Sequence, residues 1–155
     1  MRYPAIIEMP RGEDRRIRMA FDGSGFVDLG PRKERIAIND GIMPFNYGYI
    51  EHATNKTEGD NLDVIILSKK RYKTGDKAYV EIIAMLTREN GDHKLIAADD
   101  SLGYTSFSDV PIKERNMIVG YFGYKSKITS VEDKEHAEEY LKTCFTEQKL
   151  ESQKL

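Results

Sequence analysis

Three carboxylates stand within a short stretch of this chain, directly before an apolar run. They are Glu58, Asp60 and Asp63, and the run is Val64-Ile65-Ile66-Leu67. Because Asp63 adjoins residues that should be buried, we expect it at the mouth of a strand, where Asp60 and Glu58 can converge on the same cation. A hard cation such as Mg²⁺ takes oxygen ligands and keeps several waters, so a few carboxylates suffice. A solvated turn with polar caps is the plainer interpretation of the same residues.

A second acidic point lies further along the chain, at Asp92, with Lys94 two residues later. In a strand these two side chains point to the same face. A carboxylate on a metal ion and a lysine on phosphate oxygens is what a metal–phosphate site requires. An ordinary surface ion pair explains the same spacing.

Composition limits the classes of protein to consider. The chain has 155 residues, enough for a single domain over 1–155, and its formal net charge is −2. This near-neutral balance argues against a general nucleic-acid binder, and no apolar run is long enough to cross a membrane. Glu8 and Pro10 interrupt the region where an export signal would be apolar, and Cys144 has no partner for a disulfide. We therefore expect a cytoplasmic protein without a membrane or nucleic-acid partner.

The elements that must position these carboxylates are mainly strands. Apolar and alternating runs separated by turn residues predict a small barrel or sandwich. Asn90-Gly91 is typical of a hairpin tip, because both residues tolerate positive φ. The run 64–67 lacks alternation, so this strand should be covered on both faces. The expected strands are Ala5–Met9, Arg16–Phe21, Arg35–Ile38, Tyr47–His52, Val64–Leu67, Ala78–Leu86 and His93–Ala97.

The last third of the chain predicts two helices. The first is expected from about Asp109 to Phe122, with Pro111 in its first turn and Gly123 as its stop. The second should follow Ser130 and Asp133, which resemble a capping box. The tail after Gln148 is polar and is expected to fray. The second helix carries a core-facing stripe of Ala137, Tyr140, Leu141, Cys144 and Phe145.

Five pieces of the chain, in order, resemble the family I soluble inorganic pyrophosphatases. The resemblance implies an α+β, mainly β protein: an OB-like five-stranded barrel with additional strands and two C-terminal helices packed against it. The matching pieces are Ile7-Glu8-Met9-Pro10 (I-E-x-P), Pro44-Phe45-Asn46-Tyr47-Gly48-Tyr49-Ile50 (P-x-N-Y-G-Y-I), Asp60-Asn61-Leu62-Asp63-Val64 (D-P-x-D-V/L), Gly91-Asp92-His93-Lys94-Leu95-Ile96-Ala97 (G-x-D-x-K-x-x-A) and Tyr124-Lys125 (Y-K).

The same resemblance implies roles for individual residues. Mg²⁺, or Mn²⁺ or another divalent ion, would be held by carboxylates, with Asp60 also accepting a proton from water and Tyr47 at the reacting centre. Glu8 would be a polar residue at the edge of the site, and the family suggests a homo-oligomer. The implied metal ligands are Asp60, Asp63 and Asp92, and the implied phosphate ligands are Arg18, Arg35, Tyr47, Lys94, Tyr124 and Lys125.

The chain departs from the family pattern where metal would bind. Glu58 stands where the family has Asp, so its oxygens move by one methylene. Before the hairpin tip the family has another metal-binding Asp, and here Arg88 or Glu89 takes that place. Glu89 would keep a metal ligand if it reaches inward, whereas Arg88 would oppose a cation. Ala20 stands where the family usually has Glu.

Three functions are therefore compatible with the sequence. The first is hydrolysis of inorganic pyrophosphate to two phosphates by metal-activated water, with an altered metal shell. The second is hydrolysis of another small phosphoanhydride or polyphosphate. The third is a non-catalytic binding or assembly role on the same barrel, because OB-like barrels serve many functions.

Overall fold

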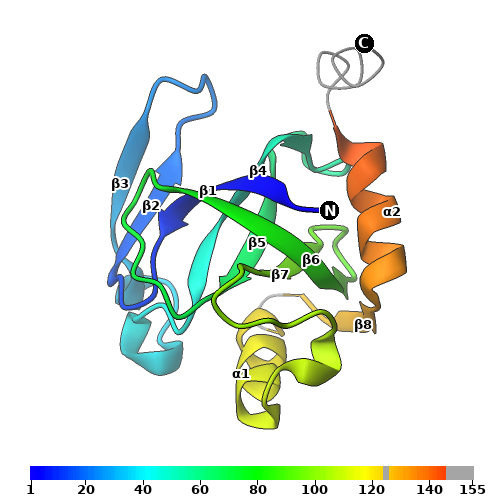
Figure 1. Cartoon of the computed structure of the whole chain (residues 1–155). Helices are drawn as coiled ribbons and strands as arrows, with labels where there is room; N and C mark the ends of the chain where they lie inside the picture. Colours follow the sequence, from blue (N-terminus) through cyan, green and yellow to red (C-terminus); the bar gives the residue numbers. More distant parts are fainter. Residues whose placement is uncertain (124–125, 146–155) are drawn as a thin grey trace.

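Strands dominate the part of the chain that the computed structural model describes, residues 1–123 and 126–145 (Figure 1). Tyr124, Lys125 and the tail after Gln148 lie outside these residues. The strands are β1 (Tyr3–Met9), β2 (Arg15–Met19), β3 (Phe26–Pro31), β4 (Asn46–Thr54), β5 (Asn61–Leu67), β6 (Lys77–Arg88), β7 (Lys94–Ala98) and β8 (Ile128–Glu132). The helices are α1 (Ile112–Phe122) and α2 (Lys134–Cys144), with short 3₁₀ turns η1 (Arg32–Glu34), η2 (Ile38–Gly41) and η3 (Phe107–Asp109).

The main sheet closes on itself. Its strands run in the order β1-β4-β5-β7-β6-β8, and β1 also pairs with β6, so β1, β4, β5, β7 and β6 form a five-stranded barrel. β8 extends the sheet beyond β6, and β2 with β3 forms a separate two-stranded hairpin. Only β5 and β7 run parallel among the pairings of this sheet in residues 1–123 and 126–145. The predicted mixed, mainly β barrel is confirmed.

β5 is buried on both of its faces, as its unbroken apolar run predicts. Val64 and Ile66 belong to one core cluster, and Ile65 and Leu67 belong to the other. The first cluster includes Ala137, Leu141 and Cys144 of α2, and the second includes Ile118, Tyr121 and Phe122 of α1. Alternate side chains of one strand therefore belong to two different cores, one shared with α2 and the other with α1.

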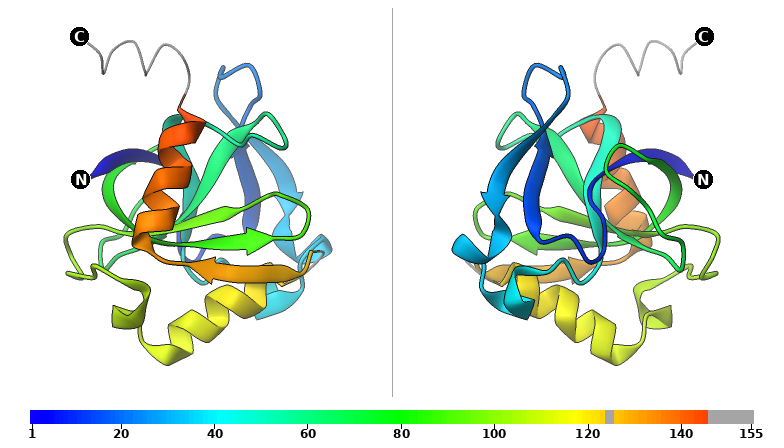
Figure 2. Two further views of the ribbon diagram at one scale, coloured as in Figure 1. Left: turned by 90° about the vertical axis from the view of Figure 1, so that its right-hand side faces the viewer. Right: turned by 90° about the vertical axis from the view of Figure 1, so that its left-hand side faces the viewer.

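The two helices cover different sides of the barrel, with α2 along one flank and α1 across the end near β8 (Figure 2). α1 begins after Pro111 and ends at Gly123, as expected. The expected capping box at Ser130 is wrong, because Ser130 lies within β8. Asp133 caps α2 alone, since its carboxylate accepts a hydrogen bond from the backbone N–H of His136 at 3.0 Å.

Two strand predictions need correction. The stretch Arg35–Ile38 forms no strand and leads into the turn η2, where Asn39 and Asp40 have φ of 54° and 55°, outside the extended region. β3 was not expected, because most of its residues are exposed and it shows no apolar alternation. The hairpin tip at Gly91, with φ of 81°, joins β6 and β7 as predicted.

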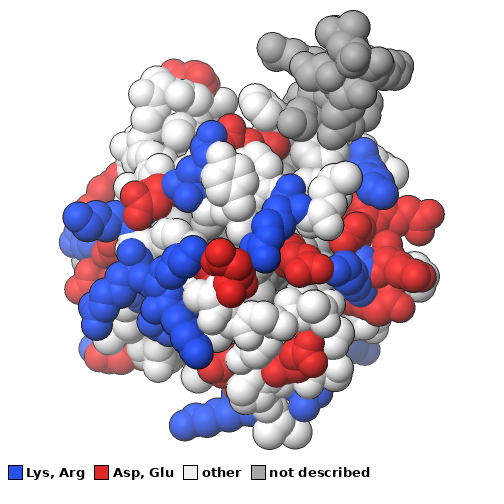
Figure 3. Space-filling view, in the orientation of Figure 1, with Lys and Arg blue, Asp and Glu red and all other residues white. Residues whose placement is uncertain are grey.

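No helix within residues 1–123 and 126–145 is long and apolar enough to cross a membrane. The face shown in Figure 3 is charged with both signs: basic side chains gather on its left part and acidic ones on the right, where α2 lies. The formal net charge of −2 over the whole sequence hides this local separation.

Candidate active site

A pocket of about 320 Å³ opens between the barrel and the β2–β3 hairpin. Its volume is in the range of small-molecule sites. It combines acidic and basic side chains in nearly equal number. The acidic ones are Glu8, Glu58, Asp60, Asp63 and Asp92, and the basic ones are Arg16, Arg18, Arg32, Arg35, Arg88 and Lys94.

The pairing of the barrel strands brings the central residues together. β5 and β7 run parallel with Val64 opposite Leu95, so the preceding residues Asp63 and Lys94 come side by side. β4 pairs with β5 so that Tyr49 is opposite Asp63, and Tyr47 projects from β4 toward the same pocket. Residues from three strands thus converge on one point.

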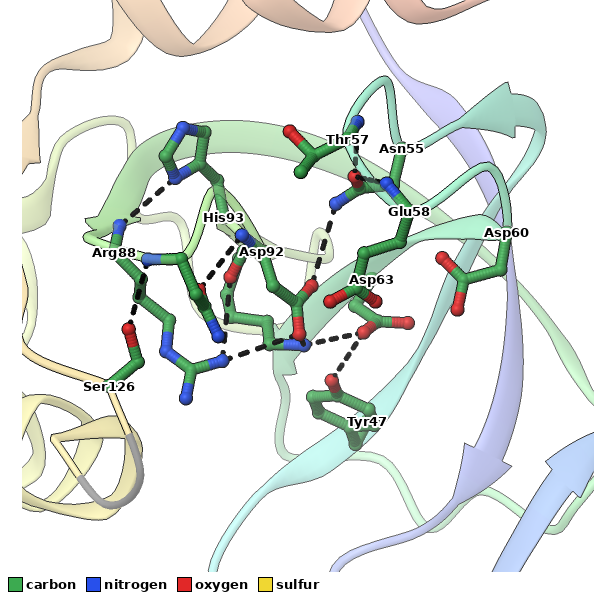
Figure 4. A network of polar contacts seen from close by, with 12 residues as sticks. Tyr47, Asn55, Thr57, Glu58, Asp60, Asp63, Arg88, Asp92, His93 and Ser126 are labelled. Carbon is green, nitrogen blue, oxygen red and sulfur yellow. Dashed lines mark hydrogen bonds and ion pairs between the residues drawn. The ribbon is translucent and has the colours of Figure 1, made fainter.

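Lys94 is the centre of a buried ionic network, whose partners Tyr47, Asp63 and Asp92 are labelled in Figure 4. Its Nζ lies 2.6 Å from Asp63 Oδ2 and 3.0 Å from Asp92 Oδ2, while its side chain is only 5% exposed. The Tyr47 hydroxyl donates to the same Asp63 Oδ2 at 2.8 Å. Lys94 Nζ also lies 5.6 Å from the centre of the Tyr47 ring, within cation–π range.

This network fixes the protonation of its members. Burial favours the neutral amine of Lys94, but its neighbours Tyr47, Asp63 and Asp92 outweigh burial and hold the pKa of Lys94 well above its usual value. Burial, and then the Asp63 charge, raises the pKa of Tyr47 well above its ordinary value. Lys94 is therefore a permanent cation, and Tyr47 is a hydrogen-bond donor rather than a base.

A turn after β4 presents the other carboxylates. Asn55 is 1% exposed, and its Oδ1 accepts from the backbone N–H of Thr57 at 2.9 Å and of Glu58 at 3.0 Å. Its Nδ2 donates to Asp92 Oδ1 at 3.5 Å. Asn55 therefore ties the turn that carries Glu58 and Asp60 to the hairpin tip that carries Asp92.

Mutual repulsion marks the carboxylates as a cluster. We call Glu58, Asp60, Asp63 and Asp92 the carboxylate wall. Burial, followed by the charges of Asp63 and Asp92, raises the pKa of Asp60. Burial, followed by the charges of Asp92 and Asp60, raises the pKa of Glu58. A cation bound between them would relieve this repulsion.

The opposite side of the pocket is basic. We call Arg16 and Arg18 of β2, together with Arg35, the arginine wall; all three line the pocket. Burial, and then the charges of Arg35 and Arg18, lowers the pKa of Arg16, so the three guanidinium groups lie close enough to repel one another. Arg18 approaches the carboxylate wall, with Nη2 at 3.9 Å from Asp60 Oδ2. Such a wall suits an anion with several charged oxygens.

Glu8 joins the two walls. Its side chain is buried, and Oε2 accepts a hydrogen bond from the backbone N–H of Met19 at 2.8 Å, which attaches β2 to β1. Burial raises the pKa of Glu8 to about 7. Its expected place at the edge of the site agrees with its position in the pocket lining.

At the hairpin tip, the two candidates for the family's metal-binding position are separated by the structure. Arg88 is 9% exposed and lines the pocket, with Nη1 at 3.3 Å from Asp92 Oδ2. Glu89 is exposed and does not contribute to the described pocket lining. The guanidinium therefore takes the inward position, and the metal role predicted for Glu89 has no support from this geometry.

The residues fit a divalent cation on one side of the pocket. Among residues 1–123 and 126–145, no three acidic, His or Cys side chains form a ready-made metal cage. Mg²⁺ does not require one, because it binds through one or two carboxylates and completes its shell with water and substrate phosphate. Glu58 and Asp60, which repel each other and lie beside Asp63, supply the carboxylate ligands that such an ion requires. Asp92 differs, because Arg88 and Lys94 already contact its Oδ2.

Most of the residues proposed from the sequence line this pocket. The structure brings together Glu8, Arg18, Arg35, Tyr47, Glu58, Asp60, Asp63, Asp92 and Lys94. The predicted phosphate ligands Tyr124 and Lys125 fall outside the described residues. Sequence reasoning missed Arg16 and Asn55. The i, i+2 spacing of Arg16 and Arg18 on one strand face was a usable signal for the first, whereas nothing in the sequence marks Asn55.

Comparison with known proteins gives a consistent picture. A family model described as inorganic pyrophosphatase matches residues 5–150. An inorganic pyrophosphatase of Nanoarchaeum equitans is 30% identical over 123 residues, which are 77% of this chain. The match spans 64% of the length of that relative.

Solved structures share the fold at low identity. An inorganic pyrophosphatase from Neisseria gonorrhoeae superimposes with a TM-score of 0.80 at 21% identity, over 92% of this chain and 88% of that one. One from Thermus thermophilus gives 0.78 at 24% identity, over 91% and 87% of the two chains. These similarities support the barrel, whereas the residue pattern must carry the chemistry.

Proposed function

Because the chain belongs to the inorganic pyrophosphatase family, we propose that it hydrolyses inorganic pyrophosphate to two phosphates in the pocket between the two walls. The observation that carries the proposal is that the carboxylate wall and the arginine wall line the same pocket of about 320 Å³. A small, highly charged anion that is bound to divalent cations matches both walls, because the arginines can bind the anion and the carboxylates can bind the cations. An arginine wall alone would suit any anion, and a carboxylate wall alone any cation.

In this mechanism the side chains of the pocket mainly position the substrate and stabilise its negative charge. Water attacks one phosphorus, the bond from that phosphorus to the bridging oxygen breaks, and the second phosphate leaves with the bridging oxygen. Positioning and charge stabilisation dominate such a reaction. Mg²⁺ or another divalent ion, held by Glu58, Asp60 and Asp63, would supply Lewis-acid polarisation and a water of lowered pKa.

Individual residues have distinct tasks. Asp60 accepts the proton of the attacking water as a general base. Lys94 and the Tyr47 hydroxyl donate hydrogen bonds to the phosphate oxygens while negative charge shifts from one of these oxygens to another. Arg18 and Arg35 bind the other phosphate and stabilise it as it leaves.

The proposal also covers the location of the protein, its oligomeric state and its remaining phosphate ligands. We place the enzyme in the cytoplasm as a homo-oligomer, on the family resemblance, and we propose Tyr124 and Lys125 as further phosphate ligands. Near-neutral net charge disfavours nucleic acid as a partner.

A substrate panel tests the proposal. Phosphate release is measured from pyrophosphate, tripolyphosphate and ATP, each with Mg²⁺, with Mn²⁺ and with a chelator. We expect pyrophosphate to give the highest kcat/KM and the chelator to abolish release. Faster release from tripolyphosphate would favour the polyphosphatase alternative, and metal-independent binding without any release would favour the non-catalytic one.

A further inference from the structure

Charges of opposite sign alternate along one edge of the pocket. Asp92 Oδ2 lies 3.3 Å from Arg88 Nη1 and 3.0 Å from Lys94 Nζ, and Lys94 continues to Asp63 Oδ2 at 2.6 Å. One carboxylate oxygen is therefore shared by two cations. The Arg88 and Lys94 side chains are only 8% and 5% exposed, so solvent screens these contacts weakly.

Local structure holds Arg88 in this inward position. It is the last residue of β6, and it pairs there with Ile128 of β8. Its backbone N–H donates to His93 Nδ1 at 3.0 Å across the hairpin tip. In Figure 4 the guanidinium reaches Asp92 from the side opposite Glu58 and Asp60. The cation at this point is thus part of the fold rather than a flexible surface arginine.

A fixed guanidinium changes what the Asp92 side of the pocket can bind. A divalent ion on Asp92 from that side would meet the positive charge of Arg88, whereas a phosphate oxygen would be attracted by it. Arginine is also the side chain best suited to phosphate, since its planar fork of N–H donors stays charged at every working pH. Within residues 1–123 and 126–145, the ion pair on the Glu58 and Asp60 side of the pocket is longer, with Arg18 Nη2 at 3.9 Å from Asp60 Oδ2.

We propose that Arg88 is a built-in cation that takes the place of one divalent metal ion: it binds a phosphate oxygen directly on the Asp92 side and leaves metal binding to the Glu58–Asp60–Asp63 side. This inference rests on the proposed function, because it names how the same pocket holds the substrate. It goes beyond that function by assigning a phosphate-binding residue and a reduced number of metal ions.

The first test needs no turnover. Binding of methylene diphosphonate, a pyrophosphate analogue with a carbon bridge, is measured by calorimetry without divalent metal for wild type, Arg88→Met and Arg71→Met. Arg71 is exposed and outside the described pocket lining, so its variant removes the same charge as a matched control. We expect Arg88→Met to weaken binding by about tenfold or more, from the worth of a charge-assisted hydrogen bond, and Arg71→Met to change it by less than about twofold.

The second test counts metal. Bound Mn²⁺ per chain is measured by equilibrium dialysis for wild type, Arg88→Asp and Glu89→Ala, with folding checked by circular dichroism. The proposal expects one additional Mn²⁺ in Arg88→Asp and no change in Glu89→Ala. A lower count in Glu89→Ala would overturn it, because Glu89 would then be a ligand. If Arg88→Asp does not fold, the Arg88→Met result with the diphosphonate decides.

Failure of this inference is distinguishable from failure of the proposed function. Wild type that hydrolyses pyrophosphate while Arg88→Met binds the diphosphonate as tightly as wild type keeps the function and rejects the role of Arg88. Wild type that binds neither diphosphonate nor Mn²⁺ rejects both.

Discussion

The two walls of the pocket are built in different ways. In the carboxylate wall Asp63 stands on β5, while Glu58 and Asp60 lie on the turn after β4 and Asp92 lies at the tip of the β6–β7 hairpin. Buried Lys94 joins Asp63 to Asp92, Tyr47 donates to Asp63, and buried Asn55 ties the turn to Asp92. Arg16 and Arg18 of the arginine wall stand on β2 of a two-stranded hairpin whose other strand, β3, is mostly exposed, and Arg18 lies 3.9 Å from Asp60 of the carboxylate wall. The first wall is preorganised, and the second can adjust to the anion.

This contrast suggests a division of labour. Preorganised charges stabilise a transition state without rearrangement, so the carboxylate wall should control kcat. The arginines on β2 hold a phosphate group of the substrate in the ground state as well as in the transition state, so the arginine wall should control KM. Substitutions on each wall test whether kcat and KM respond separately in this way.

The largest effect is expected at Asp63. Asp63→Asn removes a metal ligand and the charged partner of Lys94 and Tyr47, so we expect kcat for pyrophosphate to fall by about a thousandfold. The matched control is Asp100→Asn, an exposed carboxylate paired with Lys70 at 2.8 Å, which should leave kcat within about twofold. An Asp63→Asn enzyme with more than a tenth of the wild-type kcat would remove Asp63 from the reacting centre.

A smaller effect is expected at Asn55. Asn55→Ala frees the turn that carries Glu58 and Asp60, so we expect about tenfold lower kcat/KM and a weaker apparent affinity for Mg²⁺. Steady-state kinetics over a range of Mg²⁺ concentrations measure both quantities. Asn116→Ala, on the exposed face of α1, is the control. An unchanged Mg²⁺ dependence in Asn55→Ala would show that the turn is held without Asn55.

The arginine wall should respond in KM. Arg18→Met is expected to raise KM about tenfold with kcat reduced less than about threefold. Arg15→Met provides the comparison on the same strand, because Arg15 pairs with Asp28 at 3.0 Å and its side chain is 45% exposed. A fall in kcat at unchanged KM in Arg18→Met would place this residue with the preorganised wall instead.

The contribution of Glu8, which attaches β2 to β1, can be measured through the pH dependence of the free energy of unfolding. Its pKa is raised by burial from 4.5 to about 7, so the folded state holds a proton more tightly than the unfolded state. The stabilisation from Glu8 protonation is full below about pH 4.5 and is lost as pH rises to about 7, on the order of 3 kcal/mol. Glu8→Gln should remove this dependence and be the more stable protein at pH 8.

Urea unfolding at several pH values, in a chelator, measures the difference between Glu8→Gln and wild type. The two free energies of unfolding should diverge between about pH 5 and pH 7 and then run parallel. Curves that stay parallel across that whole range would show that Glu8 keeps an ordinary pKa in the fold.

The sequence predicted the carboxylate wall better than the arginine wall, for a physical reason. Buried strands carry strong periodic signals, so the apolar run 64–67 and the tip at Asn90-Gly91 correctly located Asp63, Asp92 and Lys94. β3 is mostly exposed and lacks such a pattern, and the left-handed Asn39 and Asp40 end what looks like a strand at Arg35–Ile38. The β2–β3 hairpin was therefore predicted only at β2, and Arg16 was missed although it shares a strand face with Arg18.

Contacts set by tertiary structure were also beyond the sequence. The inward turn of Arg88 rather than Glu89 depends on the register of β6 with β8, which joins residues 40 or more positions apart in the chain. The role of Asn55 depends on a hydrogen bond to Asp92 in another hairpin. Neither residue type signals such a position by itself.

The central claim is that metal-dependent hydrolysis of pyrophosphate takes place where the two walls meet. The most direct measurement is phosphate release from pyrophosphate by the purified, folded chain, with Mg²⁺ and with a chelator, in water enriched in ¹⁸O. The account predicts two phosphates per pyrophosphate, one ¹⁸O atom in one of them, and no release in the chelator. Release at the background rate with either Mg²⁺ or Mn²⁺ would contradict it.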